Sequence, residues 1–337
     1  MASFGGIDLG GTKIQAAIVD EDSNVLGSAR RPTPTSGGPE DVAREMARAL
    51  RDAALATETE PAGLAGVGVG SPGTVRGGDV ISARNLPGWE GTYALGPELE
   101  RLLGCPVVLG NDVRVATVAE FELGAGRLYK SLLGVFWGTG VGGGLILDGK
   151  PWVGRGAAGE IGHVVVELDG AQCTCGRRGC MEAYAGRAAM EAHAEHLHRD
   201  KGRRTDLFKL MQERGRTRVT SGVWAKALER GDKLAVHMID RAVQALATGV
   251  ASVLNVLDVE GVVLGGGLGV RLGHPYAKRI AEEMLPHLFA DYDPPPLHVA
   301  ALGDLGGAIG ASLLVREQGA NGAAPVTGSS PAAAPRA

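Results

Sequence analysis

The sequence predicts an α/β protein built from two similar halves with a ligand-binding cleft between them. The first observation is length, because 337 residues exceed what one hydrophobic core usually supports. The second is a duplication: an apolar strand, a Gly/Thr turn and another apolar strand occur at Phe4–Asp20 and again at Ser131–Gly154, about 130 residues later. The third is glycine, which makes up 54 of 337 residues and indicates backbone that turns sharply or approaches a ligand closely.

Composition describes an ordinary globular protein, with 44% hydrophobic and 21% charged residues. A net charge of −4 argues against a polyanion such as DNA as the main partner. The N-terminal segment lacks the basic and apolar regions of a secretion signal. The uncharged runs Ser131–Leu147 and Ala242–Leu257 are too short and too broken to span a membrane. We therefore expect a cytoplasmic protein without nucleic-acid or membrane partners.

The first half opens with a predicted hairpin of buried strands on either side of a Gly10–Gly11 turn, followed by a third strand near Val25–Arg30. Apolar residues at helical spacing predict an amphipathic helix over Pro39–Leu55. The pattern then predicts a buried strand over Leu64–Gly70, a helix over Pro97–Leu103, a strand over Cys105–Gly110 and a helix that begins at Val113.

Polar residues at two places in this half are candidates for ligand binding. Asn111 and Asp112 follow the predicted strand at its C-terminal end, where α/β proteins place their chemistry. Asp112 could instead be the N-cap of the next helix. Asn85 could hydrogen-bond a polar ligand while Trp89 covers its apolar face, or the segment is a turn with a packed indole. Cys105 is interpreted as a core residue.

Two segments, Gly138–Gly143 and Gly68–Gly73, match the dinucleotide-binding pattern G-x-G-x-x-G. That pattern requires a helix after the glycines, whereas a predicted strand follows the first segment and a turn follows the second. We therefore reject a Rossmann fold. The duplicated Gly/Thr turns instead predict N–H groups and hydroxyls that hold phosphate oxygens, with a plain tight hairpin as the alternative.

A metal site is predicted where three of the four cysteines gather. The four candidate ligands are His163, Cys173, Cys175 and Cys180. Three thiolates and one imidazole form the tetrahedral set that structural zinc favours. A disulfide and unliganded thiols are the alternatives, but a Cys-x-Cys pair is poorly placed to bridge itself and three cysteines leave one over. Glu160 and Glu182 lie beside this set and indicate that the metal shapes a pocket.

The remaining second half is predicted to be mainly helical, over Glu182–Arg199, Val223–Arg230 and Lys233–Val256. Gly261–Gly269 reads as a buried strand whose triple glycine lets a flat ligand lie against the backbone. No metal site is assigned to His193, His196 and His198, because no thiolate or carboxylate is paired with them. The basic run Arg199–Arg218 also contains acidic residues, so we interpret it as a charged surface and not as a nucleic-acid site. A last strand, a closing helix and a disordered tail are predicted over Pro294–Leu302, Gly306–Arg316 and 319–337.

Taken together, these motifs resemble those of the ROK family of bacterial sugar kinases, in the actin-like and hexokinase-like ATPase group, over residues 4–318. Asp8–Lys13 resembles the first phosphate motif, Gly138–Gly144 the second, and Gly265–Gly267 the glycines on the adenosine side. The run from Glu160 through His163 and the cysteines to Glu182 resembles the family signature. The resemblance implies two actin-like (ribonuclease H-like) domains with a cleft between them. A small domain would comprise residues 1–113 completed by a helix over 303–318, and a large domain with the zinc site would comprise residues 114–302.

The resemblance also implies ATP-dependent transfer to the 6-hydroxyl of a hexose, by an enzyme that is commonly a homodimer. The segment Asn85–Trp89 looks more like the glucokinase branch than the others. Asp112 is the expected general base, zinc is structural, and Asp8 acts on Mg²⁺ bound with ATP. The expected sugar-binding residues are Asn85, Asn111, Asp112, Glu160, His163 and Glu182. The expected ATP- and Mg²⁺-binding residues are Asp8, Gly10, Gly11, Thr12, Lys13, Gly138, Thr139, Gly140, Gly265, Gly266 and Gly267.

Other functions stay open at this point. The acceptor could be mannose, N-acetylmannosamine or fructose, and the donor could be polyphosphate. A sugar-responsive repressor of the same family would carry a helix-turn-helix domain ahead of the phosphate motif, for which Asp8 leaves no room. A catalytically silent sugar-binding module is disfavoured by Asp112 and the phosphate turns.

Overall fold

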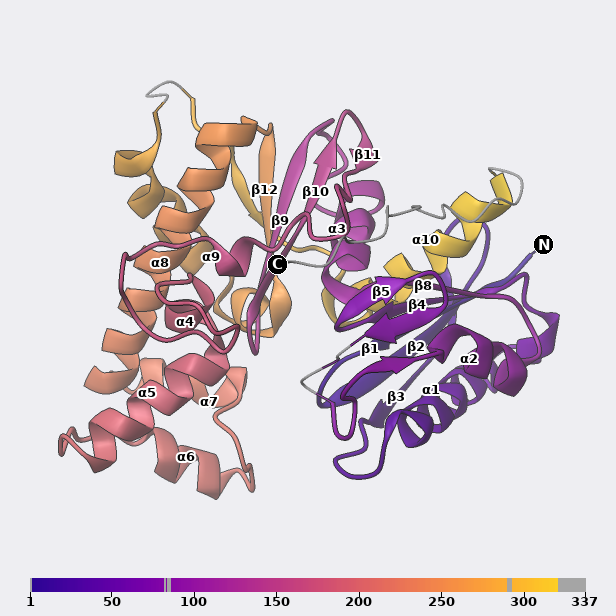
Figure 1. Ribbon diagram of the computed structural model, residues 1–337, viewed down its shortest axis with the longest axis horizontal. Coiled ribbons are helices and arrows are strands. Elements are labelled where there is room, and N and C mark those ends of the chain that lie inside the picture. Colours follow the sequence, from indigo (N-terminus) through magenta and orange to yellow (C-terminus); the bar gives the residue numbers. More distant parts are fainter. Residues whose placement is uncertain (1, 82, 84–85, 290–292, 321–337) are drawn as a thin grey trace, which may run out of the picture. The chain divides into compact units, whose positions relative to one another are not determined.

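The computed structural model describes residues 2–81, 83, 86–289 and 293–320. The chain divides into two compact units (Figure 1). The first unit comprises Met1–Ala116 and the chain from Asp304 onward, and the second comprises Thr117–Gly303. The second unit is therefore an uninterrupted segment inserted into the first.

The first unit contains a five-stranded sheet. Its strands are, in sheet order, β3 (Val25–Pro32), β2 (Lys13–Val19), β1 (Phe4–Leu9), β4 (Val67–Ser71) and β8 (Val107–Asn111). β1, β2 and β3 form the predicted antiparallel meander, and β1, β4 and β8 are parallel. Parallel neighbours need crossover connections, which helices supply here.

Helices cover both faces of this sheet. α1 (Pro39–Ala54) begins with a proline at its first turn and packs on β2 and β3, with α2 (Leu95–Leu103) beside it. α10 (Gly306–Ala320), yellow in Figure 1, packs on β1 and β4 although about 300 residues separate it from β1. A Cβ on Gly6 would lie 1.8 Å from the Ala308 carbonyl oxygen. Only glycine permits this close approach of helix and sheet.

The second unit repeats the same plan. Its strands are, in sheet order, β11 (Lys150–Pro151), β10 (Val141–Leu147), β9 (Leu132–Trp137), β12 (Gly261–Gly265) and β13 (Leu297–Val299). β9, β10 and β11 form an antiparallel meander, and β9, β12 and β13 are parallel. The duplication predicted from the two Gly/Thr turns is thus confirmed as two sheets of identical strand order.

Most helices of the second unit pack around α8 (Lys233–Leu257), whose Asp232 cap accepts hydrogen bonds from the Leu234 and Ala235 amides. The others are α4 (Glu182–Ala185), α5 (Arg187–Arg199), α6 (Leu207–Glu213), α7 (Ser221–Glu229) and α9 (Gly266–Met284). α3 (Asp112–Glu122) begins in the first unit and ends in the second. Short 3₁₀ turns occur at η1 (Pro61–Gly63), η2 (Ile161–His163), η3 (Leu285–His287) and η4 (Gly303–Leu305).

Several sequence predictions were wrong in detail. The helix predicted over Glu182–Arg199 is two helices, because Gly186 has extended ψ (φ −58°, ψ 127°) and separates α4 from α5. The strand predicted over Gly261–Gly269 ends at Gly265, where α9 begins. The predicted strand over Pro294–Leu302 is confined to β13.

A further difference concerns the segment after Gly68–Gly73, where the sequence predicted a turn. It forms a small antiparallel sheet of β5 (Thr74–Arg76), β6 (Asp79–Ile81) and β7 (Thr92–Tyr93). Strands of two or three residues are too short to show alternation in the sequence. At the C-terminus α10 extends to Ala320, into the segment predicted to be disordered, and residues 321–337 of that segment lie outside the described residues.

Among the helices that the structure describes, none has the combination of length and apolar character needed to cross a lipid bilayer.

Candidate active site and metal centre

Asp8 is the buried carboxylate of the first phosphate motif. It lies near the end of β1, on the sheet face that packs against α10. A Cβ on Gly307 would lie 2.7 Å from the Asp8 Cγ atom, so the start of α10 closes directly over the carboxylate. Burial raises the pKa of Asp8 to about 6, and the nearby Lys13 cation opposes this rise. A cation bound beside Asp8 would stabilise the ionised form of this carboxylate.

Lys13 begins β2, just after the turn that follows Asp8. The Gly10 amide donates to the Lys13 carbonyl at 2.9 Å and closes this turn. The Lys13 ammonium contacts the Gln15 side chain and lies 3.2 Å from Asp304 Oδ1. The lysine is therefore held by side chains of the first unit beside the predicted phosphate motif.

Asn111 and Asp112 lie where β8 ends and α3 begins. Asn111 Oδ1 accepts a hydrogen bond from the Arg114 amide at 3.2 Å, which is the bond that an N-cap residue makes. Asp112 Oδ1 accepts from the Val113 amide at 2.9 Å. A Cβ on Gly110 would lie 2.7 Å from Val115, so the glycine just before this pair allows α3 to pack closely.

The other polar loop of the first unit is only partly described, since the predicted ligand residue Asn85 lies outside the described residues. Trp89 is 2% exposed and packs edge-to-face against Tyr93 with ring centroids 5.6 Å apart. The structure thus agrees with the packed-indole alternative for Trp89.

The second phosphate turn, between β9 and β10, is held from two sides. The Arg187 amide donates to the Gly138 carbonyl at 3.1 Å, and the Ala188 amide donates to the Thr139 carbonyl at 3.0 Å. On the other side Glu182 Oε2 accepts from the Val141 amide at 2.9 Å, and a Cβ on Gly140 would lie 2.2 Å from that same oxygen. A side chain larger than hydrogen at Gly140 would therefore displace Glu182.

The triple glycine Gly265–Gly267 joins β12 directly to α9. Gly266 has φ +78°, and a Cβ there would lie 2.5 Å from the Trp137 carbonyl oxygen at the end of β9. A Cβ on Gly138 would lie 3.9 Å from the Gly267 amide nitrogen. The triple glycine and the second phosphate turn are therefore neighbours in the second unit, as their shared assignment to ATP requires.

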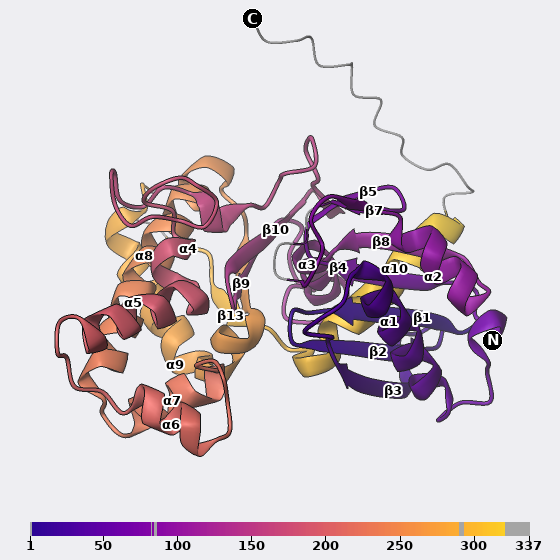
Figure 2. The same cartoon turned by 60° about the horizontal axis from the view of Figure 1, so that its bottom comes forward.

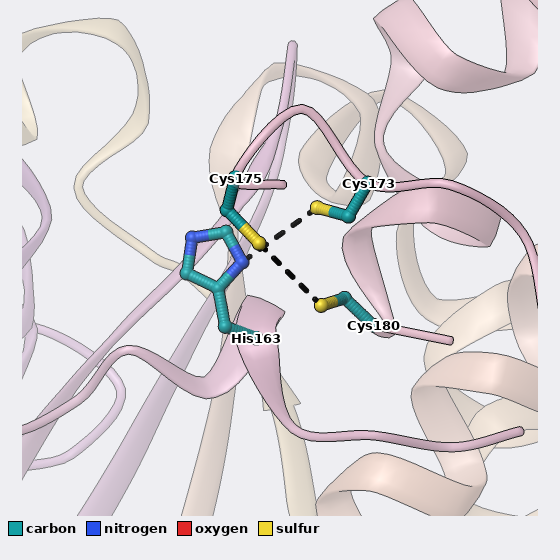
Figure 3. A group of neighbouring side chains, drawn as sticks. All are labelled: His163, Cys173, Cys175 and Cys180. Carbon is teal, nitrogen blue, oxygen red and sulfur yellow. Dashed lines mark hydrogen bonds between the residues drawn. The ribbon is translucent and has the colours of Figure 1, made fainter. Parts of the chain in front are cut away.

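The four predicted metal ligands converge (Figure 3). One ligand atom from each of His163, Cys173, Cys175 and Cys180 lies within 4.8 Å of all the others. Cys175 and Cys180 have sulfurs 3.7 Å apart, and His163 Nδ1 lies 3.8 Å from the Cys173 sulfur. A sulfur–sulfur bond is about 2.05 Å long, which excludes a disulfide, whereas tetrahedral zinc with Zn–S bonds of about 2.3 Å separates its sulfurs by about 3.8 Å.

The local backbone explains this convergence. His163 ends the 3₁₀ turn η2, and a bridge between Val165 and Cys180 brings the two ends of the segment together. Gly176 and Gly179 have φ of +89° and +77°, which lets the chain turn tightly between the cysteines. The donor set and its spacing fit a zinc ion.

Electrostatics in this cluster also suit a cation. Burial raises the pKa of Cys173, and raises that of Cys180 to about 12. A hydrogen bond from the Arg177 backbone lowers the pKa of Cys175 to about 7. Three neighbouring thiolates are stable together only when a positive ion neutralises them.

Two glutamates border the cluster. His163 Nε2, the ring nitrogen that faces away from the thiols, lies 3.9 Å from Glu160 Oε2. Glu182 Oε1 lies 4.0 Å from the Cys173 sulfur, while its other oxygen holds the second phosphate turn. His163 thus presents one ring nitrogen to the metal ligands and the other to a carboxylate, as is usual for a histidine that binds a metal.

One polar side chain at the second phosphate turn was not found by sequence analysis. The Arg187 guanidinium donates to the Thr139 and Ser221 hydroxyls, each at 2.9 Å. Residues 139, 187 and 221 are far apart in sequence and form no motif, and Arg187 was expected inside a continuous helix. Only the break at Gly186 places Arg187 at a helix start facing this turn.

The fold and the motifs together define a member of the ROK family, whose family model matches residues 4–318. The chain belongs to this family. It is 32% identical over 319 residues to a glucokinase of Thermotoga maritima, covering 93% of this chain and 97% of the relative. It is 31% identical over 299 residues to an N-acetylmannosamine kinase of Salmonella typhi, covering 87% and 90%. These relatives place the chain among the sugar kinases of the family.

The structural comparison agrees. The crystal structure of a ROK family glucokinase from Streptomyces griseus in complex with glucose and AMPPNP matches with a TM-score of 0.80 at 28% identity. The match covers 94% of this chain and 100% of that one. The predicted actin-like α/β fold is therefore confirmed.

Proposed function

We propose that this protein is a glucokinase, an enzyme that transfers the terminal phosphoryl group of ATP to the 6-hydroxyl of glucose. The observation that carries the proposal is the orientation of His163, which turns Nδ1 to the three cysteines and Nε2 to Glu160. This arrangement supplies a fixed imidazole and a carboxylate for neighbouring sugar hydroxyls. Glucokinases among the relatives at 30% identity or more support glucose as the acceptor.

On the acceptor side, Glu160, His163 and Glu182 bind the 1- and 2-hydroxyls of the sugar in this proposal, and Asn85 and Asn111 orient it. Glu160 is exposed, so its carboxylate is available to a ligand. Glu182 already accepts one backbone hydrogen bond, and a carboxylate has lone pairs for further donors. A carboxylate that accepts from two hydroxyls discriminates strongly against sugars lacking either one.

Asp112 is the proposed general base. A sugar hydroxyl is a weak nucleophile until its proton is removed, and a positioned carboxylate supplies this step. Asn111 Oδ1 accepts from the Arg114 amide at the start of α3, which fixes the backbone from which Asp112 projects, and Asn111 Nδ2 is the group proposed to donate to the sugar. Attack of the 6-oxygen on phosphorus then breaks the bond to ADP, and Asp112 retains the proton.

Donor binding is assigned to the two phosphate turns and the triple glycine. Gly10, Gly11, Thr12 and Lys13 serve in the first unit, and Gly138, Thr139, Gly140 and Gly265–Gly267 in the second. Bound Mg²⁺ neutralises charge on the phosphates. Asp8 is the residue proposed to hold it, through water, because magnesium keeps several waters and needs few carboxylates.

Zinc has a structural role in this proposal. His163, Cys173, Cys175 and Cys180 would hold it, and as a closed four-ligand site it contributes folding energy rather than an activated water. His163 and the loop between Glu160 and Glu182 are thereby fixed. The test is metal content and sugar affinity measured together, described in the Discussion.

The proposal includes two further properties taken from family resemblance, a homodimeric state and a cytoplasmic location. Analytical ultracentrifugation tests the first. Fractionation of the cells that produce the protein tests the second. A monomer at micromolar concentration would contradict the assembly without affecting the chemistry.

The decisive experiment is a coupled assay that crosses glucose, mannose, fructose, N-acetylmannosamine and N-acetylgalactosamine with ATP, ADP and polyphosphate. We expect the highest kcat/KM with glucose and ATP. The relatives named as N-acetylmannosamine and N-acetylgalactosamine kinases make these sugars the main competing acceptors. Consumption of none of the sugars with any donor would refute a kinase, and preference for an N-acetylated sugar would refute glucokinase.

A further inference from the structure

Arg187 is anchored to the second phosphate turn by its own backbone. It is the first residue of α5, and its amide and the next one donate to the carbonyls of Gly138 and Thr139. Two otherwise unpaired amides of a helix start are thereby satisfied by the turn. The Arg187 side chain is therefore fixed relative to the Thr139 hydroxyl and does not depend on a flexible loop.

The hydroxyls around the Arg187 guanidinium act as acceptors toward it. One nitrogen donates to Thr139 Oγ1 and the other to Ser221 Oγ, both at 2.9 Å. Each hydroxyl has a single proton, which then points away from the guanidinium. Within the described part of the chain, neither hydroxyl donates to another residue, and three of the five guanidinium N–H groups make no hydrogen bond. This group of side chains therefore offers both hydroxyl protons and the remaining guanidinium N–H groups as donors to a ligand.

The positive charge of Arg187 has no carboxylate of its own among the described residues. Its closest acidic neighbour on α5, Glu191, accepts a hydrogen bond from Arg218 Nε at 3.0 Å. Across the described ranges, Arg187 forms no ion pair within 4.0 Å. Burial lowers the pKa of Arg187, and the charge of the nearby Glu191 opposes this shift only in part. A partly buried guanidinium of this kind gains most from an anionic ligand.

The surroundings show where such an anion would lie. A Cβ on Gly267 would lie 3.6 Å from Ser221 Oγ, so the triple glycine adjoins the same hydroxyl that Arg187 contacts. Figure 2 shows α5, α7 and α9 gathered in the same part of the second unit. Arg187 thus lies between the two second-unit segments assigned to the donor.

We propose that Arg187 binds a phosphate group of the donor, next to Thr139 and Ser221. The proposal rests on the kinase function proposed above and adds a residue to its donor site. The planar fork of a guanidinium matches two phosphate oxygens, and the hydroxyl protons of Thr139 and Ser221 supply further donors. The competing interpretation is that Arg187 only braces the turn between β9 and β10.

The test uses Arg187→Met, which removes the charge at similar length, and Arg187→Lys, which keeps it. Dissociation constants for ATP, inorganic tripolyphosphate and adenosine are measured by calorimetry on the full chain. We expect Arg187→Met to weaken ATP and tripolyphosphate by roughly 10- to 100-fold, because charge-assisted hydrogen bonds are lost. Adenosine affinity should change less than about twofold, and Arg187→Lys should recover part of the loss, since lysine keeps the charge without the fork.

The matched control is Arg199→Met, at the opposite end of the same helix, where the arginine is exposed and pairs with Glu195 at 2.8 Å. It removes the same charge and should leave ATP affinity unchanged. An equal loss of ATP and adenosine affinity in Arg187→Met, or a lowered melting temperature that accounts for the loss, would establish bracing and overturn the proposal. Unchanged ATP affinity would also overturn it.

The result also separates this proposal from the function on which it rests. If the unaltered protein binds tripolyphosphate through Arg187 but phosphorylates no sugar, the phosphate site stands and the kinase assignment fails. If the unaltered protein phosphorylates glucose and Arg187→Met keeps its KM for ATP, the kinase stands and the role of Arg187 fails. If the unaltered protein binds neither ATP nor tripolyphosphate, both fail.

Discussion

Glu182 accepts a hydrogen bond from the Val141 amide at 2.9 Å. Its other carboxylate oxygen lies 4.0 Å from the sulfur of Cys173, one of the four metal ligands. A single side chain therefore connects the metal centre to the first residue of β10, directly after the second phosphate turn. Loss of the metal should consequently weaken binding of the phosphate donor as well as binding of the sugar.

Replacing Glu182 separates its two roles. Glu182→Ala removes the acceptor for the Val141 amide, so the KM values for both ATP and glucose should rise. Glu182→Gln retains a carbonyl oxygen for that amide, so the KM for ATP should return to within a few-fold of normal while the KM for glucose stays high. Steady-state kinetics with each substrate varied in turn measures both. Identical effects of the two substitutions on ATP would contradict a backbone-holding role.

Cys175→Ser should lower the zinc content and raise the glucose KM together, because a three-ligand site no longer fixes His163. Elemental analysis and kinetics on the same preparation provide the measurement. Cys105→Ser is the control, since Cys105 is buried in the first unit and belongs to no metal cluster. Normal glucose affinity in zinc-free Cys175→Ser protein would refute the coupling.

Asp112→Asn should reduce kcat by roughly 10²- to 10⁴-fold, the usual contribution of a general base. Glucose binding should change only a few-fold, because an amide retains the shape and one acceptor of the carboxylate. Calorimetry with glucose and a coupled assay test the two parts. Asp22→Asn, an exposed turn residue of the same unit, serves as the control. A variant that binds glucose and turns over normally would mean that another group takes the proton.

The stability of the first unit should depend on pH through Asp8. Burial raises the pKa of Asp8 from 3.8 to about 6, so the folded state holds more protons than the unfolded state between these values. The free energy of unfolding therefore falls as pH rises from about 4 to about 6 and Asp8 ionises in the folded state. At neutral pH the ionised, buried Asp8 lowers the free energy of unfolding by about 3 kcal/mol.

Asp8→Asn should thus increase the free energy of unfolding at pH 7.5, by up to about 3 kcal/mol, while abolishing activity. The gain should vanish near pH 3, where Asp8 is largely protonated in both states. Urea titrations of both proteins at the two pH values give the difference. A difference that does not change with pH would show that the charge of Asp8 is not its source.

Gly307→Ala should destabilise the protein although alanine favours helices. The new Cβ would lie 2.7 Å from the Asp8 carboxyl, and overpacking of this kind costs about 1–3 kcal/mol. The KM for Mg·ATP should rise as well. Gly38→Ala, where an added Cβ meets nothing within 4 Å, is the control: as the loss of a good N-cap residue of α1 it should cost about 0.5–1 kcal/mol and leave the KM for Mg·ATP unchanged. Thermal melts and ATP kinetics decide, and a more stable Gly307→Ala would contradict the predicted clash.

The parts of this structure that could be predicted from sequence are those that depend on residues close together in the chain. The two meanders follow from apolar runs on either side of Gly/Thr turns, and the metal cluster follows from residue types and spacing within one short segment. The rejection of a Rossmann fold is also confirmed, because β10 rather than a helix follows Gly138–Gly140. In each case the information lies within about 20 neighbouring residues.

The parts that were missed depend on distant residues. Trp89 could be assigned to the core only once Tyr93 was seen packing on it. The contact of Arg187 with Thr139 joins residues 48 positions apart, and the break at Gly186 that permits it is marked in the sequence only by this one glycine, without a proline. The helical start at Gly266 was hidden because three glycines favour neither strand nor helix.

The position of α10 has a consequence for how the protein is made. A ribosome completes β1 and β4 early, yet the helix that covers their glycine-lined face comes after an insertion of about 190 residues. At an elongation rate of about 5–20 residues per second, this delay is about 10 to 40 s. During this time the face of the N-terminal sheet that α10 later covers stays exposed. The inserted unit has no such delay, because its elements are continuous in sequence. Transiently exposed sheet surface is prone to aggregation, so the first residues of the chain are the part that most needs a chaperone during synthesis.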